Sequence, residues 1–293
     1  MDKENKIIQG DCIEEMKKLE ENSIDAIVTD PPYNIGKAEW DKIDNYIEWC
    51  GEWVSQCERV LKNPSSFYWF HSNIKIAKDI MKYIEDNTDF KFRQMIVWNK
   101  RFTGAKNKDF LNGFVQENRL QNYNKMAEYC FYYVIDGINK IKKRRKKLGL
   151  SQSVIAKEIR SKNGNLTGWY SNIENGKYYP TKETIKPIKK HLGLELNDIV
   201  PTFNNQKTHH SVWNYEIAEK KGHITPKPIL LIENILKHSS NENDIVLDPF
   251  TGSGTTLIAC KRLNRNYIGI EMEEEYIQIA EARLQASEQK KLL

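Results

Sequence analysis

The sequence predicts a doubly wound α/β fold that is interrupted by a small all-α domain. Apolar runs typical of buried strands alternate with stretches of helical periodicity before Gly137, and this alternation resumes after the interruption. The chain holds 45 Lys or Arg and 40 Asp or Glu, a net charge of +5, but Ile138–Val200 alone has a net charge of +10. We therefore expect a basic, purely helical insert at 138–201, which divides one α/β domain into segments 1–137 and 202–293.

The first segment opens with a β-α-β pattern. Residues 24–29 form a nearly continuous apolar run, as in a strand buried on both faces of a parallel sheet. The adjacent prolines of Asp30-Pro31-Pro32-Tyr33 end this strand in a loop, because proline lacks the backbone donor of other residues. Residues 101–125 are polar and rich in Asn, which predicts a long surface loop. Other strands are expected at residues 6–8, 67–70, 93–98 and 128–134, and helices at residues 12–19, 74–84 and 44–61, the last with Ile47, Val54, Cys57 and Leu61 as its apolar face.

The last segment contains a glycine-rich turn between a strand and a helix. Gly252 and Gly254 allow the backbone to turn tightly and to approach a ligand closely. Glu271 ends the next strand, 23 residues after Asp248, where an acid is placed to bind the two hydroxyls of a ribose. A third glycine is absent, which favours a nucleoside-type cofactor over a dinucleotide. The elements expected here are strands at residues 245–247 and 266–270 and helices at residues 228–238, 255–263 and 273–284.

The Asp30-Pro31-Pro32-Tyr33 loop offers groups that suit an amine on a flat ring. In an open α/β sheet, ligands bind outside the carboxyl ends of the strands. The Asp30 carboxylate and a neighbouring backbone carbonyl are two acceptors, and an NH2 group has two donors. The Tyr33 ring can stack on a base, which contributes about 1–3 kcal/mol. An ordinary Pro-Pro turn is the alternative interpretation of this loop.

Three motifs together resemble the S-adenosylmethionine-dependent amino methyltransferases of DNA, in the order with the catalytic motif first (the β group). They are Gln9-Gly10-Asp11-Cys12, then Asp30 to Gly36, then Asp248 to Thr255, and the resemblance covers residues 6–136 and 209–285. The segment from His223 to Pro228 resembles the family's H-P-T-Q-K-P, but it departs from that pattern at Ile224 and Pro226. The resemblance implies a Rossmann-like methyltransferase sheet. It assigns catalysis to Asp30, Pro31, Pro32 and Tyr33, and cofactor binding to Asp11, Cys12, Asp30, Thr225, Lys227, Asp248, Phe250, Gly252, Gly254, Thr255 and Glu271.

By this resemblance, the reaction is direct transfer of a methyl group from S-adenosylmethionine to an exocyclic amine of a base flipped out of DNA. Asp30 and the Pro31 carbonyl accept the two N–H groups of the amine, Tyr33 stacks on the base, and no metal takes part. Family usage favours the N6 amine of adenine for Asp-Pro-Pro-Tyr, with the N4 amine of cytosine as the alternative. Methylation at carbon 5 of cytosine is disfavoured, because the sequence has no Pro-Cys pair.

The insert resembles the helix-turn-helix domains of the Cro/repressor type over about residues 138–200. Its marks are Ser151-Gln152, where Ser151 suits a helix N-cap, and Ile173 to Lys177. The turn at residues 160–166 is about four residues longer than usual. A solvated charged face, with Trp169 and Tyr170 in the core of the domain, is the alternative. By analogy, base edges are assigned to Gln152, Thr167, Trp169 and Asn172, and phosphates to Arg144, Lys146 and Lys177.

The remaining expectations concern the setting of the protein. The five cysteines include no C-x-x-C pair, which predicts reduced thiols, and no apolar run is long enough to span a bilayer, so we expect a cytoplasmic protein. Double-stranded DNA is the expected partner. A cognate restriction endonuclease and a homodimer are left open. Two other classes of function remain as alternatives: a DNA-binding regulator with a vestigial enzyme domain, and an NAD-type oxidoreductase.

Overall fold

The computed structural model describes residues 4–36, 41–100, 102, 127–159, 168–204, 210–218 and 226–289. The chain divides into two compact units. The first comprises Met1–Lys62, Ser66–Tyr133 and Phe203–Leu293, and the second comprises Asn63–Ser65 and Val134–Thr202. The predicted loop at residues 101–125, apart from residue 102, lies outside the described residues.

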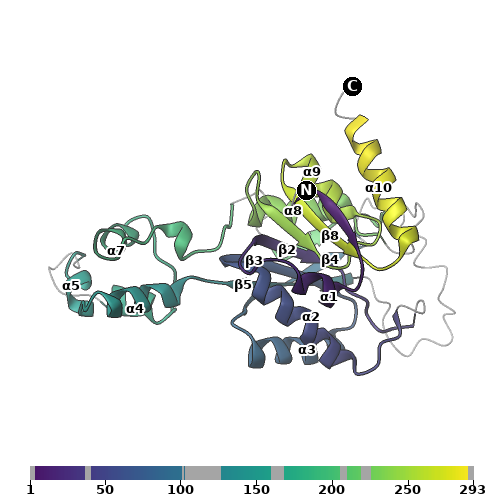
Figure 1. The fold of residues 1–293 in the computed structure, drawn as a ribbon. Helices are drawn as coiled ribbons and strands as arrows, with labels where there is room; N and C mark the ends of the chain where they lie inside the picture. Colours follow the sequence, from purple (N-terminus) through teal and green to yellow (C-terminus); the bar gives the residue numbers. More distant parts are fainter. Residues whose placement is uncertain are drawn as a thin grey trace. The chain divides into compact units, whose positions relative to one another are not determined.

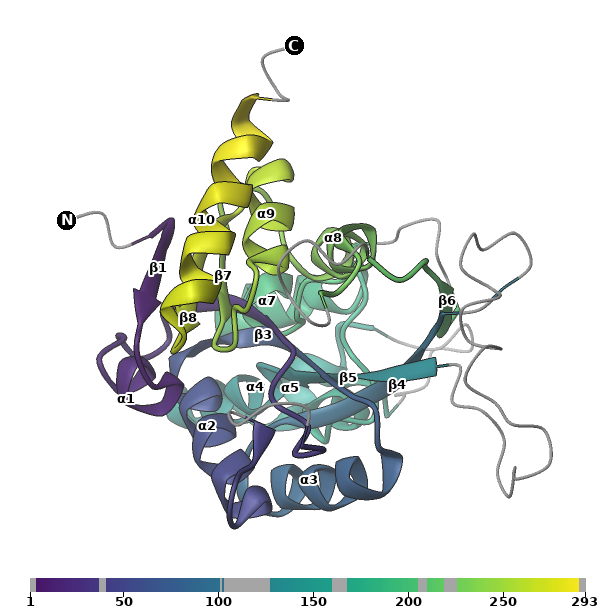
Figure 2. The ribbon, with the colours of Figure 1, turned by 90° about the vertical axis from the view of Figure 1, so that its right-hand side faces the viewer.

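The centre of the first unit is an eight-stranded sheet of described residues (Figures 1 and 2). Its strand order is β1-β8-β7-β2-β3-β5-β4-β6, and the pairs β1–β8, β8–β7, β7–β2, β2–β3 and β4–β6 are parallel. The strands predicted from the sequence are all present, and β6 is one that the sequence analysis missed. The bounds are β1 Lys6–Gln9, β2 Ile24–Thr29, β3 Leu61–His71, β4 Lys91–Asn99, β5 Ala127–Ile135, β6 Val212–Asn214, β7 Ile245–Asp248 and β8 Asn266–Glu271.

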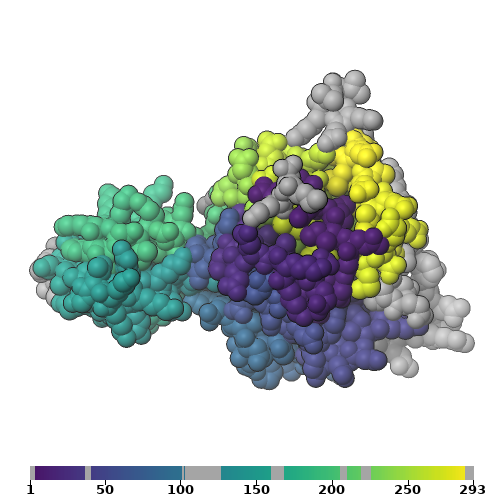
Figure 3. Space-filling model, viewed as in Figure 1, coloured from purple at the N-terminus to yellow at the C-terminus, as the bar shows by residue number. Residues whose placement is uncertain are grey.

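Helices cover both faces of this sheet, which explains why β2 is apolar on both sides. Figure 2 shows α1, α2 and α3 on one face and α8, α9 and α10 on the other. Figure 3 shows α10, in yellow, lying against the N-terminal segment, in purple, on the surface of this unit. The bounds are α1 Cys12–Lys17, α2 Tyr46–Val60, α3 Ile74–Asn87, α8 Ile229–Ser239, α9 Thr255–Arg262 and α10 Glu274–Gln289.

Two predictions about helix faces have different outcomes. The buried face of α10 carries Ile277, Ala280 and Leu284, as expected. The predicted face of α2 is wrong in part, because Ile47 is only half-buried and Leu61 already begins β3. Aromatic side chains do more of the packing on α2 than the aliphatic pattern indicated; Tyr46 and Trp53 are buried there.

Apart from residues 63–65 of β3 and 134–135 of β5, the regular elements among the described residues of the second unit are helices. This unit contains α4 Ile138–Lys147, α5 Gln152–Ala156, α6 Trp169–Glu174, α7 Ile185–Leu192 and a 3-10 turn at Leu196–Asp198. Its core gathers one apolar face from each helix, including Ile141, Ile155, Tyr170 and Ile188. The basic run of α4 points outward, apart from Arg145, which forms an ion pair with the buried Glu174 at 2.6 Å.

Two side chains of this unit differ from their predicted roles. Trp169 is 8% exposed and belongs to the core, and its indole N–H donates to the Ala156 carbonyl at 2.9 Å. The assignment of Trp169 to a base edge is therefore wrong, and the alternative that it packs in the core is correct. Ser151 occupies the N-cap position of α5, but its hydroxyl bonds to that of Ser153 and does not cap the helix.

Membrane-spanning helices and metal-binding clusters are both absent from the described part of the chain. No helix there is both long and apolar enough to cross a membrane. No group of three or more His, Cys, Asp and Glu side chains in the same ranges is arranged to hold a metal ion. All five cysteines are buried and free.

Candidate active site

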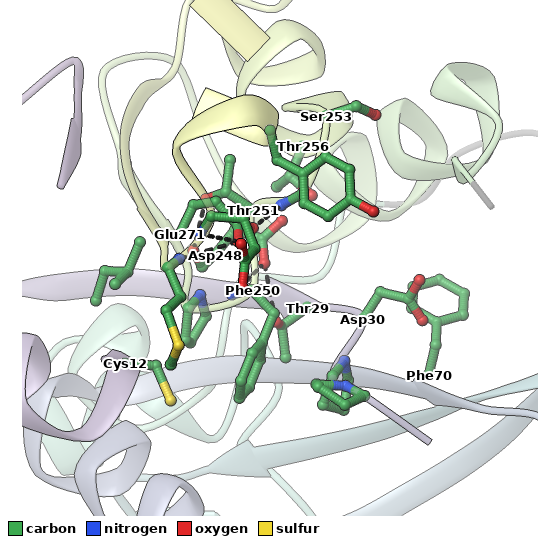
Figure 4. Close-up of a pocket in the computed structure, with 18 of the residues that line it drawn as sticks. Cys12, Thr29, Asp30, Phe70, Asp248, Phe250, Thr251, Ser253, Thr256 and Glu271 are labelled. Carbon is green, nitrogen blue, oxygen red and sulfur yellow. Dashed lines mark hydrogen bonds between the residues drawn. The ribbon is translucent and has the colours of Figure 1, made fainter. Parts of the chain in front are cut away.

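A cavity of about 250 Å³ opens at the carboxyl ends of β2, β7 and β8. Because these parallel strands are neighbours, Asp30 after β2, the glycine turn after β7 and Glu271 at the end of β8 come to one edge of the sheet. All three contribute to the wall of the cavity. Figure 4 shows Cys12 and Glu271 on one side of it and Asp30 with Phe70 on the other.

The glycine-rich turn holds the Glu271 carboxylate by backbone contacts. One oxygen accepts a hydrogen bond from the Gly252 N–H at 2.7 Å, and the other accepts from Met272 at 2.9 Å and Glu273 at 3.0 Å. Gly252 has φ +51°, a conformation that side chains disfavour. Burial raises the pKa of Glu271, and the three donors oppose that shift. The carboxylate is thus fixed at the cavity wall with its charge available to hydroxyl donors.

This end of the cavity fits the nucleoside portion of S-adenosylmethionine. Apolar side chains, Ile270, Phe250 and Cys12, line it beside the Glu271 and Asp11 carboxylates. One Asp11 oxygen caps α1 by accepting from the Ile13 and Glu14 N–H groups at 2.9 and 3.1 Å. Apolar walls suit a flat base, and fixed carboxylates suit the donors of a sugar.

Asp248 lines the cavity, but most of its contacts hold the strands and the loop at this end together. Its carboxylate accepts from the Thr29 hydroxyl at 2.8 Å, which ties β7 to β2, and from the Phe250 N–H at 3.2 Å. Complete burial raises the pKa of Asp248 to about 6, although these hydrogen bonds oppose the shift. The Phe250 ring then packs between Trp49 and Trp53 of α2, with ring centres 5.6 and 5.5 Å away.

Three other residues assigned to the cofactor differ in their placement. Thr255 lines the cavity. Gly254 does not contribute to the wall, and a side chain there would meet the Cβ of Ala280 at 2.8 Å, so this glycine permits close packing of the turn on α10. Its assignment to the cofactor stays a prediction, beside the packing role that the structure gives it. Thr225 lies outside the described residues.

The opposite end of the cavity is an ionic cluster around Asp30. The Tyr33 hydroxyl donates to one Asp30 oxygen at 2.5 Å, and the Lys227 ammonium donates to the other. Lys227 also donates to the Tyr33 hydroxyl at 3.2 Å. Burial raises the pKa of Tyr33 well above its usual value, and the Asp30 charge raises it further, so Tyr33 remains a donor.

Lys227 is 7% exposed, which excludes the interpretation of this residue as a solvated surface lysine. Its ammonium lies 5.4, 5.3 and 5.9 Å from the ring centres of Tyr33, Phe70 and Trp98. Burial lowers the pKa of Lys227, but the Asp30 and Glu128 charges outweigh burial and leave it raised. Lys227 therefore contacts the Asp30 carboxylate, a role that the resemblance did not assign to it.

Glu128 completes the cluster, and the sequence analysis missed it. One of its oxygens lies 3.3 Å from the Lys227 ammonium, and the other binds Lys100. Burial raises its pKa, but the two ammonium groups outweigh burial and lower the pKa of Glu128 to about 2. The signal was a single acid at the start of an otherwise apolar and aromatic strand.

Asp41 and Asn34 hold the loop that follows Tyr33. Asp41, which is buried, accepts from the Asn34 N–H at 2.7 Å and from the Ile35 N–H at 3.0 Å. The Asn34 side chain in turn bonds to both backbone groups of Ile43, at 3.0 and 3.1 Å. The loop therefore presents Asp30, Pro31, Pro32 and Tyr33 to the cavity in a fixed conformation.

Comparison with known proteins gives consistent results. The profile of the DNA methylase family matches residues 24–282. The Type II methyltransferase M.HpaI of Haemophilus parainfluenzae is 32% identical over 286 residues, which cover 96% of this chain and 74% of that protein. The DNA adenine methyltransferase YhdJ of Escherichia coli (strain K12) is 30% identical over 290 residues, 95% of this chain and 82% of that protein. The crystal structure of the M1.HpyAVI–SAM complex is similar with a TM-score of 0.56 and 26% identity, over 95% of this chain and 99% of that chain.

Proposed function

The chain belongs to the DNA methylase family and is a site-specific DNA methyltransferase that uses S-adenosylmethionine, and we propose that its target is the N6 amine of a flipped adenine. Adenine is favoured by the relative that is named a DNA adenine methyltransferase, and an exocyclic amine as the target is supported by the contact between the Lys227 ammonium and Asp30. This contact places a nitrogen donor on the proposed catalytic carboxylate, beside the Tyr33 and Phe70 rings and inside the cavity. An aromatic amine at that position would make the same kind of contact.

The proposed mechanism uses two acceptors on one amine. Asp30 and the Pro31 carbonyl would each accept one N–H, which draws the nitrogen lone pair out of the ring and toward the incoming methyl group. S-adenosylmethionine supplies that methyl group from its sulfonium. As the N–C bond forms and the S–C bond breaks, the nitrogen loses a proton, and Asp30 is placed to accept it. Tyr33 would hold the base by stacking.

A product analysis tests the target base. The purified protein is incubated with enzymatically amplified genomic DNA, which carries no methyl groups, and with isotope-labelled S-adenosylmethionine; the DNA is then digested to nucleosides. We expect the label in N6-methyl-2′-deoxyadenosine. Label in N4-methyl-2′-deoxycytidine would overturn the adenine assignment and favour the alternative amine. DNA binding without any transfer would favour the regulator instead.

For the second unit, we propose a helix-turn-helix role in DNA binding. Its support is the outward basic face of α4, where Arg144, Lys146 and their neighbours are exposed, and the exposed Lys177 after α6. Asn172 is half-buried and donates to the Tyr178 hydroxyl at 2.7 Å, and Gln152 donates to Glu174. Both amides would have to exchange these partners for base edges. Thr167 lies outside the described residues.

The salt dependence of DNA binding tests this role. Each phosphate contact contributes a slope of about 0.9 to the fall of log K with log salt. We expect Lys146→Ala with Lys177→Ala to reduce the slope by about 2. Lys78→Ala, an exposed lysine on α3, is the matched control and is expected to leave the slope unchanged. A slope that the double variant does not change would refute the role of the insert.

A further inference from the structure

We propose that Tyr46 and His71 are positioning residues for methyl transfer, because together they fix the peptide that follows Pro32 and the ring of Tyr33. This inference rests on the proposed function of the Asp30 loop. Neither residue belongs to the motifs that the sequence analysis used. Tyr46 begins α2 and His71 ends β3, so two elements that flank β2 meet behind the catalytic loop.

A directed chain of hydrogen bonds leads from β3 to this loop. The Asn73 N–H donates to His71 Nδ1 at 2.9 Å, so Nδ1 is an acceptor and carries no proton. In the neutral ring the proton is then on Nε2, which faces the Tyr46 hydroxyl at 3.4 Å. Tyr46 uses its own proton to bind the Pro32 carbonyl at 2.6 Å. Each group thus has one orientation that satisfies its neighbours.

The surroundings of His71 keep the chain in that state. His71 is completely buried, and burial lowers its pKa to about 4, so the ring is neutral at physiological pH. Protonation would place a second hydrogen on Nδ1, directly against the Asn73 N–H. Burial therefore keeps the ring neutral, and the Asn73 N–H then selects the tautomer with its proton on Nε2.

His71 also supports the face of the catalytic tyrosine. Its ring centre lies 4.7 Å from that of Tyr33, with the rings tilted by 33°. Tyr33 lines the cavity, and His71 packs behind it. A target base that stacks on Tyr33 would therefore meet a ring whose position is supported by His71.

The loop needs such support because of its own sequence. Pro31 and Pro32 have no backbone N–H, so this stretch cannot anchor itself through its own donors. A carbonyl held by Tyr46 fixes the orientation of the peptide between Pro32 and Tyr33. The adjacent acceptors, Asp30 and the Pro31 carbonyl, are thereby set at one separation. A displacement of about 1 Å in such an arrangement can cost about 100-fold in rate.

Steady-state kinetics with the full chain, amplified unmethylated DNA and labelled S-adenosylmethionine test the proposal. We expect Tyr46→Phe and His71→Leu to lower kcat by roughly 10- to 100-fold, while KM for DNA and Kd for the cofactor stay within about twofold. His71→Gln keeps an acceptor and an N–H donor on one side chain, and we expect it to restore most of the lost kcat.

Tyr133→Phe is the matched control. Tyr133 is also a buried tyrosine of this unit, and its hydroxyl has no hydrogen-bond partner within the described ranges. We expect unchanged kcat for this variant. An unchanged kcat in Tyr46→Phe, an equal loss in Tyr133→Phe, or no difference between His71→Gln and His71→Leu would each overturn the proposal. The assay measures methyl groups transferred to DNA, whichever base receives them. Its outcome is therefore independent of whether adenine or cytosine is the target.

Discussion

The cavity has a cofactor end, at Glu271, and an amine end, at Asp30, where we propose that the target amine binds. The two ends are stabilised in different ways. At the cofactor end, the Glu271 carboxylate is held by backbone N–H groups of its own turn and of the preceding glycine loop. At the amine end, Asp30 is held by side chains instead of backbone groups: Tyr33 is three residues away, whereas Lys227 is 197 residues away. The cofactor end therefore depends on local backbone conformation, whereas the amine end depends on charges that balance one another inside the fold.

Replacing Asp30 should have the largest effect on methyl transfer, and it tests whether the two ends of the cavity act separately. We expect Asp30→Ala to lower kcat by about 1000-fold or more, because it removes the charged acceptor for the amine. Cofactor binding, measured by calorimetry, should change little, since Glu271 and its turn are untouched. Asp86→Ala, at an exposed aspartate of α3, is the control. Equal losses of turnover and cofactor affinity would show that the two ends are not separable.

Removing Lys227 should break the charge balance of the amine end. We expect Lys227→Met to lower the free energy of unfolding by about 3 kcal/mol, because it leaves Asp30 and the buried Glu128 without their shared cation. Adding Glu128→Gln should recover part of that loss. Denaturant unfolding measures both effects. If the double variant were as unstable as the sum of the single ones, the three groups would not be coupled.

Asp248 should give the cofactor end a pH dependence of its own. Its folded pKa of about 6 lies above the usual value near 4, so the folded state binds the proton more tightly and this carboxylate costs stability as the pH rises through about 6. Relative to Asp248→Asn, we expect wild-type stability to fall by about 2 kcal/mol between pH 4 and pH 7. Parallel pH profiles of the two proteins would contradict this expectation.

A smaller effect is expected from Glu271. Glu271→Gln keeps one acceptor oxygen but removes the charge, so we expect the Kd for S-adenosylmethionine to rise by about 10-fold while kcat at saturating cofactor is nearly unchanged. Calorimetry and saturation kinetics measure the two quantities. Glu275→Gln, on the exposed face of α10, is the control. A fall in kcat that saturation does not restore would place Glu271 in the chemical step.

The same difference between the two ends explains how much was predictable. The strands other than β6, the alternation of strands and helices and the turn that holds Glu271 follow from patterns within about thirty residues, and the sequence was sufficient for them. Glu128, Lys100 and His71 form their contacts in the site with residues that are distant in the sequence, so no local spacing predicted these contacts. Two signals were nevertheless present: an acid in an aromatic strand, and a histidine directly after Phe67–Phe70, at a strand end where ligands bind.

In the insert, by contrast, the sequence predicts DNA contacts for side chains that the structure shows in internal contacts. Analogy with the helix-turn-helix domains assigns Trp169 to a base edge, yet a domain this small needs its large side chains for its core. Gln152 is likewise engaged with Glu174, which also binds Arg145. Burial and internal pairing, which depend on tertiary packing, were the information that the local pattern did not contain.

The position of β2 between β3 and β7 has a consequence for how the protein is made. The Thr29–Asp248 hydrogen bond joins residues 219 positions apart, and β1, the first strand to be synthesised, pairs with β8, the last. At roughly 5–20 residues per second, a ribosome needs on the order of ten seconds or more to deliver the second partner. Throughout that interval the Asp30 loop is present but the cavity is not. A nascent chain therefore carries its entire basic segment before the cavity is complete.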